Sequence, residues 1–359
     1  MKQKEFSNEA VAFGALELEL IKESPQQWTK RVETKTSRNQ FNMLMLALNR
    51  HATYKEIRYF LDECNYLDLE KSKIATKVKG YMRQWKKKLK HLEPKVFSSE
   101  ANYTKTIHIG RNHWLIHYQY QTIKNEPSEH PFKRPTVIGV PGVAGMLMTP
   151  TSCILSALSE LKRDLIIIRK CRKESYFHDN STLLEDIHNH ISSRLGASLS
   201  QSMAFGTSAG GLAAICLGTM FGLDLVVGIS PGVAKENVSA IKNLSKNPHI
   251  HEKQAKTPKT KVVLCTASAH EQDIKEAIKI HKKLTMSTLN FHACKIYLFK
   301  NTSKHVIFNE LADQGITISE CLSLLLCDTP PENAAFNTLI IDLTSANNLE
   351  KLICSFKPD

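Results

Sequence analysis

The sequence predicts an α/β fold, a mostly parallel sheet with helices on both faces, preceded by a small all-helical module. Two observations support this prediction. After about residue 130, short apolar runs alternate with helix-like segments, which is typical of parallel strands buried on both faces. Before residue 95, apolar residues recur every three or four positions, as in amphipathic helices. The 359 residues are enough for one large domain and a smaller one.

The helical module is predicted to span residues 1–95. Its candidate helices cover 8–23, 26–35, 38–50 and 54–64, and an apolar stripe runs from Ile74 to Leu92. Short polar links join them, so we expect stacked helical hairpins. These would be loosely like a tetratricopeptide array, although the sequence shows no clear repeat of about 34 residues.

The positive charge of the chain is concentrated at the end of this module. The formal charge is +13, and residues 71–95 hold ten Lys and Arg against one acid, Glu93. Such a helix could attract a protein or an anionic partner. The simpler interpretation is a solvated helix face. No nucleic-acid-binding module accompanies the charge, so nucleic acid is not an expected partner.

Composition and motifs exclude several other classes. The nine cysteines are scattered without a CxxC pair, which indicates buried thiols in a reducing compartment and no structural metal. No dinucleotide-binding or phosphate-binding glycine motif is present, so no cofactor is expected. No secretion signal or membrane-length apolar run is found, and we expect a soluble, cytoplasmic protein.

The larger domain is predicted to span residues 100–330, followed by a C-terminal extension, 331–359. Residues 104–121 alternate in polarity around Gly110-Arg111-Asn112, which predicts a β-hairpin. The strands expected after it are 136–140, 164–169, 202–206, 224–229, 261–266 and 295–299. The helices are 150–162, 181–196, 209–221, 234–244, 271–284 and 309–326. The extension holds one more strand-like run, 339–341, which the sequence does not place.

The most informative motif is a G-x-S-x-G sequence centred on Ser208. It lies between the strand 202–206 and the helix 209–221. This is the context of a nucleophile elbow, a tight turn that lifts the serine hydroxyl clear of the sheet. Gly206 and Gly210 would permit the close approach of the backbone. Ser208 is therefore the candidate nucleophile, and the alternative is a small-residue turn that only packs tightly.

Partners for this serine follow later strands in the chain. His305 comes after the strand 295–299, where an imidazole could act as general base. Asp273 comes after the strand 261–266 and is the candidate acid, with Glu271 as the second choice. An acid at this position could also serve only to cap the first turn of a helix. The order Ser208, Asp273, His305 is the one found on α/β-hydrolase sheets.

Backbone amides near Ser208 could bind an oxyanion. Ala209 begins the helix after the serine, so its N–H is one expected donor. The second should come from the glycine-bearing turn after strand 136–140, from Gly142 or Val143.

Residues 104–328 resemble the α/β-hydrolase superfamily. The segment from Phe205 to Gly232 is similar to the elbow and following strand of bacterial hydrolase-like proteins found with glycan and glycosyltransferase systems. This resemblance implies Ser208 as nucleophile, Asp273 as acid and His305 as base. It also implies an ester or acyl group on a carbohydrate or lipid as substrate. The chain has PGVAG where a typical lipase has HGGG, so the oxyanion hole departs from that pattern.

Three functions follow from these observations. The first is a serine esterase or deacylase that works through an acyl-enzyme. The second is an acyltransferase with the same triad, which sequence does not separate from the first. The third is a non-catalytic scaffold whose basic helical module binds a partner. A patatin-like Ser-Asp dyad is set aside because the chain contains no Asp-Gly dipeptide.

Overall fold

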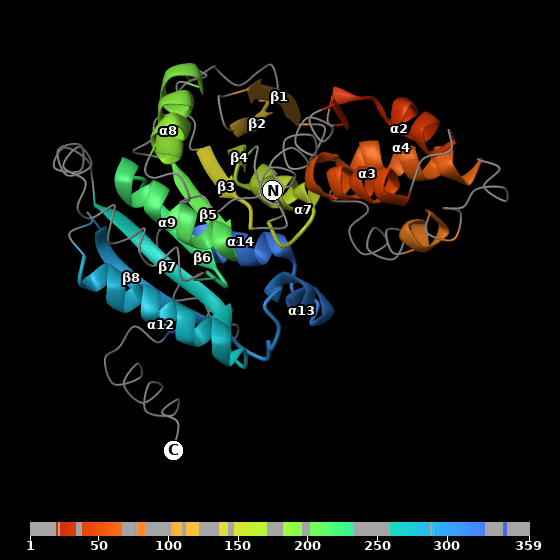
Figure 1. The fold of residues 1–359 in the computed structure, drawn as a ribbon. Helices are drawn as coiled ribbons and strands as arrows, with labels where there is room; N and C mark the ends of the chain where they lie inside the picture. Colours follow the sequence, from red (N-terminus) through yellow and green to blue (C-terminus); the bar gives the residue numbers. More distant parts are fainter. Residues whose placement is uncertain are drawn as a thin grey trace, which may run out of the picture. The chain divides into compact units, whose positions relative to one another are not determined.

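A computed structural model gives the architecture of the chain (Figure 1). It divides into two compact units, one of Met1–Tyr103 with Thr149–Glu160 and one of Thr104–Met148 with Leu161–Asp359. The predicted three-part division at residues 95–100 and 330–331 stays a prediction. The structure describes residues 19–20, 22–33, 38–66, 76, 78–83, 102–109, 113–121, 136–142, 147–170, 182–195, 202–232, 259–287, 289, 291–326 and 340–342.

The first unit is built from helices. They are α2 (Pro25–Glu33), α3 (Arg38–His51), α4 (Tyr54–Asn65) and α7 (Thr151–Glu160). Large apolar side chains form its core, among them Trp28, Leu44 and Phe60, each at most 2% exposed. The Thr151 hydroxyl at the start of α7 donates to the Arg50 carbonyl at 2.7 Å. A helix from the middle of the sequence thus belongs to the unit formed by the N-terminal helices. Much of the basic stretch 71–95 lies outside the described residues.

The second unit contains the sheet. In the described part of the chain nine strands pair in the order β1-β2-β4-β3-β5-β6-β7-β8-β9. Strands β3 to β8 are parallel, whereas β2 pairs antiparallel with β4, and β9 with β8. The strands are β1 (Tyr103–Ile109), β2 (His113–Tyr120), β3 (Thr136–Val140), β4 (Asp164–Lys170), β5 (Met203–Thr207), β6 (Leu225–Ile229), β7 (Thr260–Ala267), β8 (Phe291–Phe299) and β9 (Ile340–Asp342). The predicted hairpin and parallel strands are confirmed.

Helices cover both faces of this sheet. On one face lie α8 (Thr182–Leu195), α9 (Ala209–Phe221) and α12 (Glu271–Thr285), whose apolar residues share a core with alternate strand residues such as Val226 and Leu264 (Figure 1). Helix α14 (Ile318–Leu326) contacts β6 but contributes no described residue to that core, so it lies on the opposite face. Helix α9 is buried around its whole circumference, which explains its uniformly apolar sequence. The predicted α/β class is therefore confirmed.

The predicted helix 309–326 is wrong in one respect, because it is two helices. The first, α13 (Ile307–Asp313), ends before Gly315, whose φ of +80° is a left-handed conformation. The Ile316 N–H then donates to the Leu311 carbonyl at 2.9 Å, which closes the helix end. Gly315 is the feature of the sequence that indicates this break.

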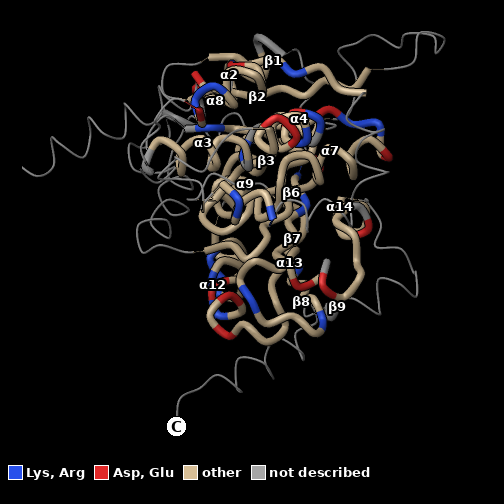
Figure 2. The backbone as a smooth tube through the Cα atoms, turned by 90° about the vertical axis from the view of Figure 1, so that its right-hand side faces the viewer, with Lys and Arg blue, Asp and Glu red and all other residues tan. Residues whose placement is uncertain are grey.

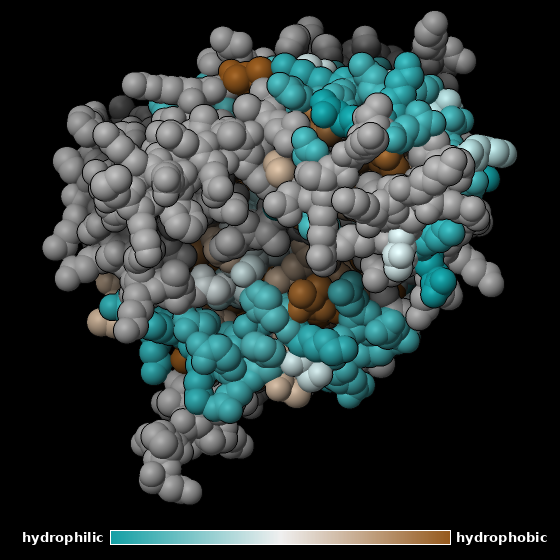
Figure 3. Space-filling model, turned by 45° about the vertical axis from the view of Figure 1, so that its right-hand side comes forward, coloured by the Kyte–Doolittle hydropathy of each residue, from teal (hydrophilic) through white to brown (hydrophobic). Residues whose placement is uncertain are grey.

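The described part of the surface is mostly hydrophilic on the face shown in Figure 3. Isolated hydrophobic groups lie between the hydrophilic ones. Helix α12 carries acids in its first turn and Lys282 and Lys283 in its last (Figure 2), which suits the helix dipole. Among the described residues, no helix combines the length and apolar character needed to cross a bilayer.

Candidate active site

Ser208 occupies a strained turn between β5 and α9. Its backbone has φ 54° and ψ −128°, an uncommon conformation for a residue with a side chain. Three backbone hydrogen bonds hold it. The Ser208 N–H donates to the Ile229 carbonyl at 2.9 Å, and the Ser208 carbonyl accepts from Gly211 at 2.9 Å and Gly232 at 3.1 Å. The predicted turn is present, and it is anchored to the end of the neighbouring strand β6.

Two glycines make this turn sterically feasible. A Cβ atom at Gly206 would lie 2.1 Å from the Gly210 carbonyl oxygen, and one at Gly210 would lie 2.2 Å from the Val140 carbonyl oxygen. Neither approach is compatible with a side chain. The expected close packing of strand and helix on either side of Ser208 is therefore observed.

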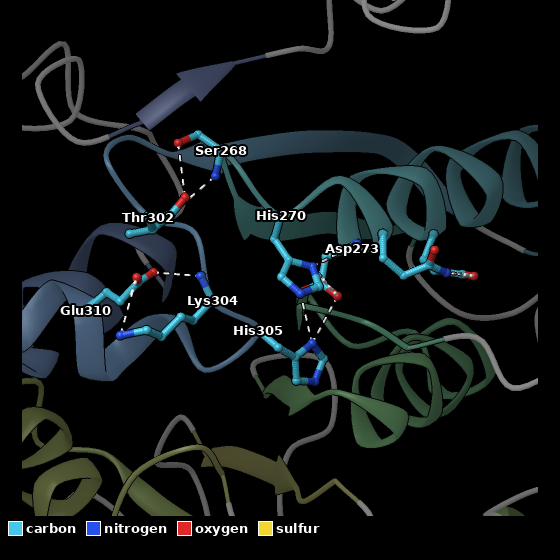
Figure 4. Close-up of polar contacts among 9 residues, drawn as sticks. Ser268, His270, Asp273, Thr302, Lys304, His305 and Glu310 are labelled. Atoms are coloured by element: carbon cyan, nitrogen blue, oxygen red, sulfur yellow. Dashed lines mark hydrogen bonds and ion pairs between the residues drawn. The ribbon is translucent and has the colours of Figure 1, made fainter. Parts of the chain in front are cut away.

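His305 and Asp273 form a hydrogen-bonded pair. The Nδ1 atom of His305 lies 2.9 Å from Oδ2 and 3.0 Å from Oδ1 of Asp273 (Figure 4). Asp273 follows β7 and His305 follows β8, and both strands run parallel to β5. The carboxyl ends of parallel strands meet at one edge of a sheet, so Ser208, Asp273 and His305 all follow strands that end at that edge.

The pair is electrostatically complementary. His305 donates a hydrogen bond to Asp273, and this bond is the largest influence on the imidazole and raises its pKa, although burial opposes this. Burial alone would raise the pKa of the Asp273 carboxyl. The hydrogen bond and charge of His305, together with Ser230 and His270, outweigh burial, so that this pKa is lowered. A carboxylate beside an imidazole of raised basicity is the arrangement needed to hold a general base and stabilise its protonated form.

The alternative acid does not reach the base. Glu271 is exposed and forms an ion pair with Lys275, one turn further along α12. Asp273, by contrast, is only 5% exposed and directed at His305. The structure thus brings together His305 and Asp273 rather than His305 and Glu271.

Ser230 connects the serine turn with the acid. It follows β6, has a positive φ of 42°, and donates its backbone N–H to the Cys265 carbonyl. The buried Ser230 hydroxyl faces Asp273 and helps to lower the pKa of that carboxyl, without a hydrogen bond of regular geometry. The Ser208 N–H is hydrogen-bonded to the carbonyl of Ile229, the residue before Ser230. The end of β6 therefore contacts both the Ser208 turn and Asp273. No local pattern in the sequence indicates a role for Ser230.

Further hydrogen bonds hold the loop that carries His305. The Thr302 hydroxyl and carbonyl contact Ser268 in the loop after β7 at 3.4 Å, and the Ala269 N–H donates to the Thr302 carbonyl at 2.9 Å. The Glu310 carboxylate accepts from the backbone N–H groups of Ser303 at 2.6 Å and Lys304 at 2.8 Å (Figure 4). These bonds restrain the residues directly before His305.

The expected oxyanion donors are described in part. Ala209 is the first residue of α9, and Gly142 lies against the serine, since a Cβ there would be 3.2 Å from the Ser208 Cβ. Val143 lies outside the described residues. Gly232 also borders the site, because its Cβ position is 3.6 Å from Ser208 Oγ and 3.8 Å from the Ala209 nitrogen. The missing side chain at Gly232 keeps space open beside the hydroxyl.

One residue beside the acid was missed by sequence reasoning. His270 caps the N-terminus of α12, and its Nδ1 lies 3.2 Å from both the backbone nitrogen and Oδ1 of Asp273. Its position immediately before a helix is a cap position, but histidine is not among the residues that commonly fill it. A search for N-cap residues therefore passes over it.

A second histidine pair lies away from this site. His113 Nε2 and His190 Nδ1 are 3.1 Å apart, and burial, with His190 as a second cause, lowers the pKa of His113 to about 4. Within the described ranges, no group of three or more His, Cys, Asp or Glu side chains has the arrangement of a metal site. The lowered pKa of His113 favours a neutral ring at this buried position.

The strand order, the antiparallel β2 and the turn at Ser208 together define an α/β-hydrolase fold for the second unit. No protein-family model matches the sequence, and the comparison with curated proteins gave no match. Similar solved structures include a CIB-like hydrolase from Thermoplasma acidophilum, at 12% identity over 59% of this chain and 93% of that one, with a TM-score of 0.39. Fluorophosphonate-binding serine hydrolase F of Staphylococcus aureus shows 14% identity over 63% and 98%, with a TM-score of 0.40. Carboxylesterase CesB of Bacillus subtilis shows 13% over 67% and 98%, with a TM-score of 0.38.

Proposed function

We propose that the protein is a serine hydrolase that cleaves an ester or acyl group through a Ser208-His305-Asp273 triad. The observation that supports this most directly is the Asp273–His305 hydrogen bond, formed after strands that end at the same sheet edge as the strained turn of Ser208. A structural ion pair would not require a serine at positive φ at the same edge of the sheet. The substrate implied by the resemblance is an acyl group on a carbohydrate or lipid.

The reaction has two halves. Ser208 Oγ attacks the acyl carbon while His305 Nε2 accepts the hydroxyl proton, and Asp273 keeps the Nδ1 hydrogen in place and stabilises the imidazolium. The amides of Ala209 and Gly142 or Val143 would bind the oxyanion of the tetrahedral intermediate. The bond to the leaving group breaks, and that group takes the proton from His305, which leaves an acyl-enzyme.

Water completes the cycle. It attacks the acyl carbon while His305 accepts one of its protons, and the second tetrahedral intermediate collapses. The Ser208 oxygen leaves with the proton held by His305. The products are the free acid and the alcohol or amine of the substrate, and the enzyme returns to its starting state.

The test is hydrolysis of p-nitrophenyl acetate and butyrate by the wild type, Ser208→Ala and His305→Ala. We expect both variants to lose activity by a factor of at least about 10². Ser287→Ala and His281→Ala, at the far end of α12, are matched controls that should keep wild-type activity. Labelling by a fluorophosphonate should require Ser208. Equal inertness of all proteins together with no labelling at Ser208 would refute the proposal.

A further inference from the structure

His270 occupies an unusual position next to the candidate acid. It is the N-cap residue of α12, and its ring nitrogen Nδ1 accepts the backbone N–H of Asp273 at 3.2 Å. Serine, threonine, aspartate and asparagine are the usual residues there, because a short oxygen side chain satisfies a free helical N–H group. Here an imidazole, with its side chain 31% exposed, takes that role.

The acid that would complete a capping box at this helix bonds to another residue instead. In a capping box the acid at the third helical position bonds back to the N-cap N–H. In α12 that acid is Asp273, but its carboxylate bonds to His305, and the His270 N–H is directed at the Ala267 carbonyl, 3.5 Å away. The imidazole therefore performs the capping without using the carboxylate.

The tautomer of His270 follows from this bond. A nitrogen that accepts a hydrogen bond carries no hydrogen, so Nδ1 holds a lone pair and the ring hydrogen is on Nε2. The same Nδ1 lies 3.2 Å from Asp273 Oδ1, an oxygen that also lies 3.0 Å from His305 Nδ1. Figure 4 shows both rings turned toward the one carboxylate.

Protonation would change what His270 does. With hydrogens on both ring nitrogens, Nδ1 becomes a donor and no longer accepts the Asp273 N–H. Its natural acceptor is then Oδ1, where it competes with His305. In the described structure the titratable groups that face His270 are Asp273 on its own helix and His305 in the loop after β8, with ring centroids 6.0 Å apart. A positive charge on His270 would also oppose a positive charge on His305.

We propose that His270 is a positioning residue for the acid: its neutral ring holds Asp273 for His305, and its protonated ring competes with His305 for Asp273 Oδ1 and places a second positive charge beside His305. This inference rests on the proposed function. It predicts that the site is switched off on the acidic side by two protons, one on His305 and one on His270, rather than by one.

Two substitutions of His270 distinguish its role as a helix cap from the effect of its protonation. His270→Asn keeps a side-chain oxygen that can cap α12 but cannot be protonated. Its kcat near neutral pH should stay within about threefold of wild type, and the acid limb of log(kcat/KM) should have a slope of about 1, where wild type steepens toward about 2. His270→Ala loses the cap, so kcat should fall about tenfold with KM nearly unchanged. His281→Asn, on the same helix, is the matched control and should keep the wild-type profile.

NMR titration of the His305 ring provides a readout that does not depend on turnover. In wild type its curve should be broadened or biphasic through the coupling to His270, and in His270→Asn it should become a single-site curve with a higher midpoint. Superimposable curves and pH profiles for these two proteins would overturn the inference. If wild type lacks hydrolysis and fluorophosphonate labelling while the NMR coupling is present, the proposed function fails and the contact between His270 and Asp273 stands.

Discussion

Helices α4 and α12 begin with the same spacing of residues and use it differently. At α4 the Thr53 hydroxyl accepts from the Glu56 N–H, and the Glu56 carboxylate accepts from the Thr53 N–H. The same reciprocal pairs occur at Ser24 with Gln27 and at Thr317 with Glu320. At α12 the N-cap residue is His270, and the acid at the third position turns away to His305. An acid in the first turn of a helix thus stabilises the helix where its carboxylate accepts from the N-cap N–H. Where another group caps the helix, the carboxylate can bond to a residue of the candidate active site.

The sharpest test of this contrast changes the two acids in parallel. Asp273→Asn should lower kcat roughly 10³-fold, because His305 loses the partner that fixes its tautomer, and should change the stability little. Glu56→Gln should leave kcat unchanged and alter the free energy of unfolding by at most about 1 kcal/mol. Steady-state kinetics and urea unfolding of both variants measure this. Retained activity in Asp273→Asn with a large loss of stability would make Asp273 a structural cap.

A second test uses the pH dependence of the residual activity. Asp273 raises the pKa of His305 above the ordinary value of 6.5, and catalysis requires the neutral imidazole. In Asp273→Asn this pKa should fall back toward its ordinary value. The acid limb of kcat/KM should then move to lower pH, so that the variant keeps a larger share of its maximal rate in acid. In Glu56→Gln the acid limb of kcat/KM should lie at the same pH as in wild type. If the acid limb of Asp273→Asn also lies at that pH, Asp273 does not raise the pKa of His305.

The smallest expected effect concerns the ordinary cap. Thr53→Ala should lower the free energy of unfolding by about 1 kcal/mol, since a helical N–H loses its partner, and Thr53→Ser should restore most of it. Neither change should affect kcat/KM. Denaturant titration gives the stabilities. A loss of activity in Thr53→Ala would show that this cap, too, supports the site.

The same contrast explains how much of the site could be predicted. The strand-to-helix turn at Ser208 and the histidine after β8 follow from local patterns, namely glycines at fixed offsets and apolar strands of even spacing. The choice between Asp273 and Glu271 as the acid does not follow from local patterns, because both lie in the first turn of α12 and either carboxylate would suit the helix dipole. Only the position of β8 beside β7 decides which carboxylate meets His305. Ser230 was missed because its role depends on Asp273, which is distant in sequence, and His270 because histidine is an uncommon N-cap residue.

Some features of the fold were equally dependent on tertiary contacts. The run 339–341 was strand-like in sequence, but its pairing with β8 depends on a connection that local patterns do not specify. The grouping of α7 with the N-terminal helices depends on contacts such as that between Thr151 and Arg50, which are 101 residues apart. Local periodicity predicted that these elements exist and not where they pack.

Strand β9 has a consequence for how the sheet ends. It pairs only with Tyr297–Phe299, the apolar last third of β8, while in the described structure the earlier part of β8 has no further strand on that side. That earlier part contains Lys295 and the exposed His292. An unpaired strand edge can add a strand from another molecule, and charged residues or a covering strand prevent this. The two parts of β8 are therefore protected from edge-to-edge pairing in different ways, the earlier part by polar residues and the later part by β9. A proteolytic cut that removed the last twenty residues would expose the apolar edge of Tyr297–Phe299, next to the loop that leads to His305, and would favour aggregation.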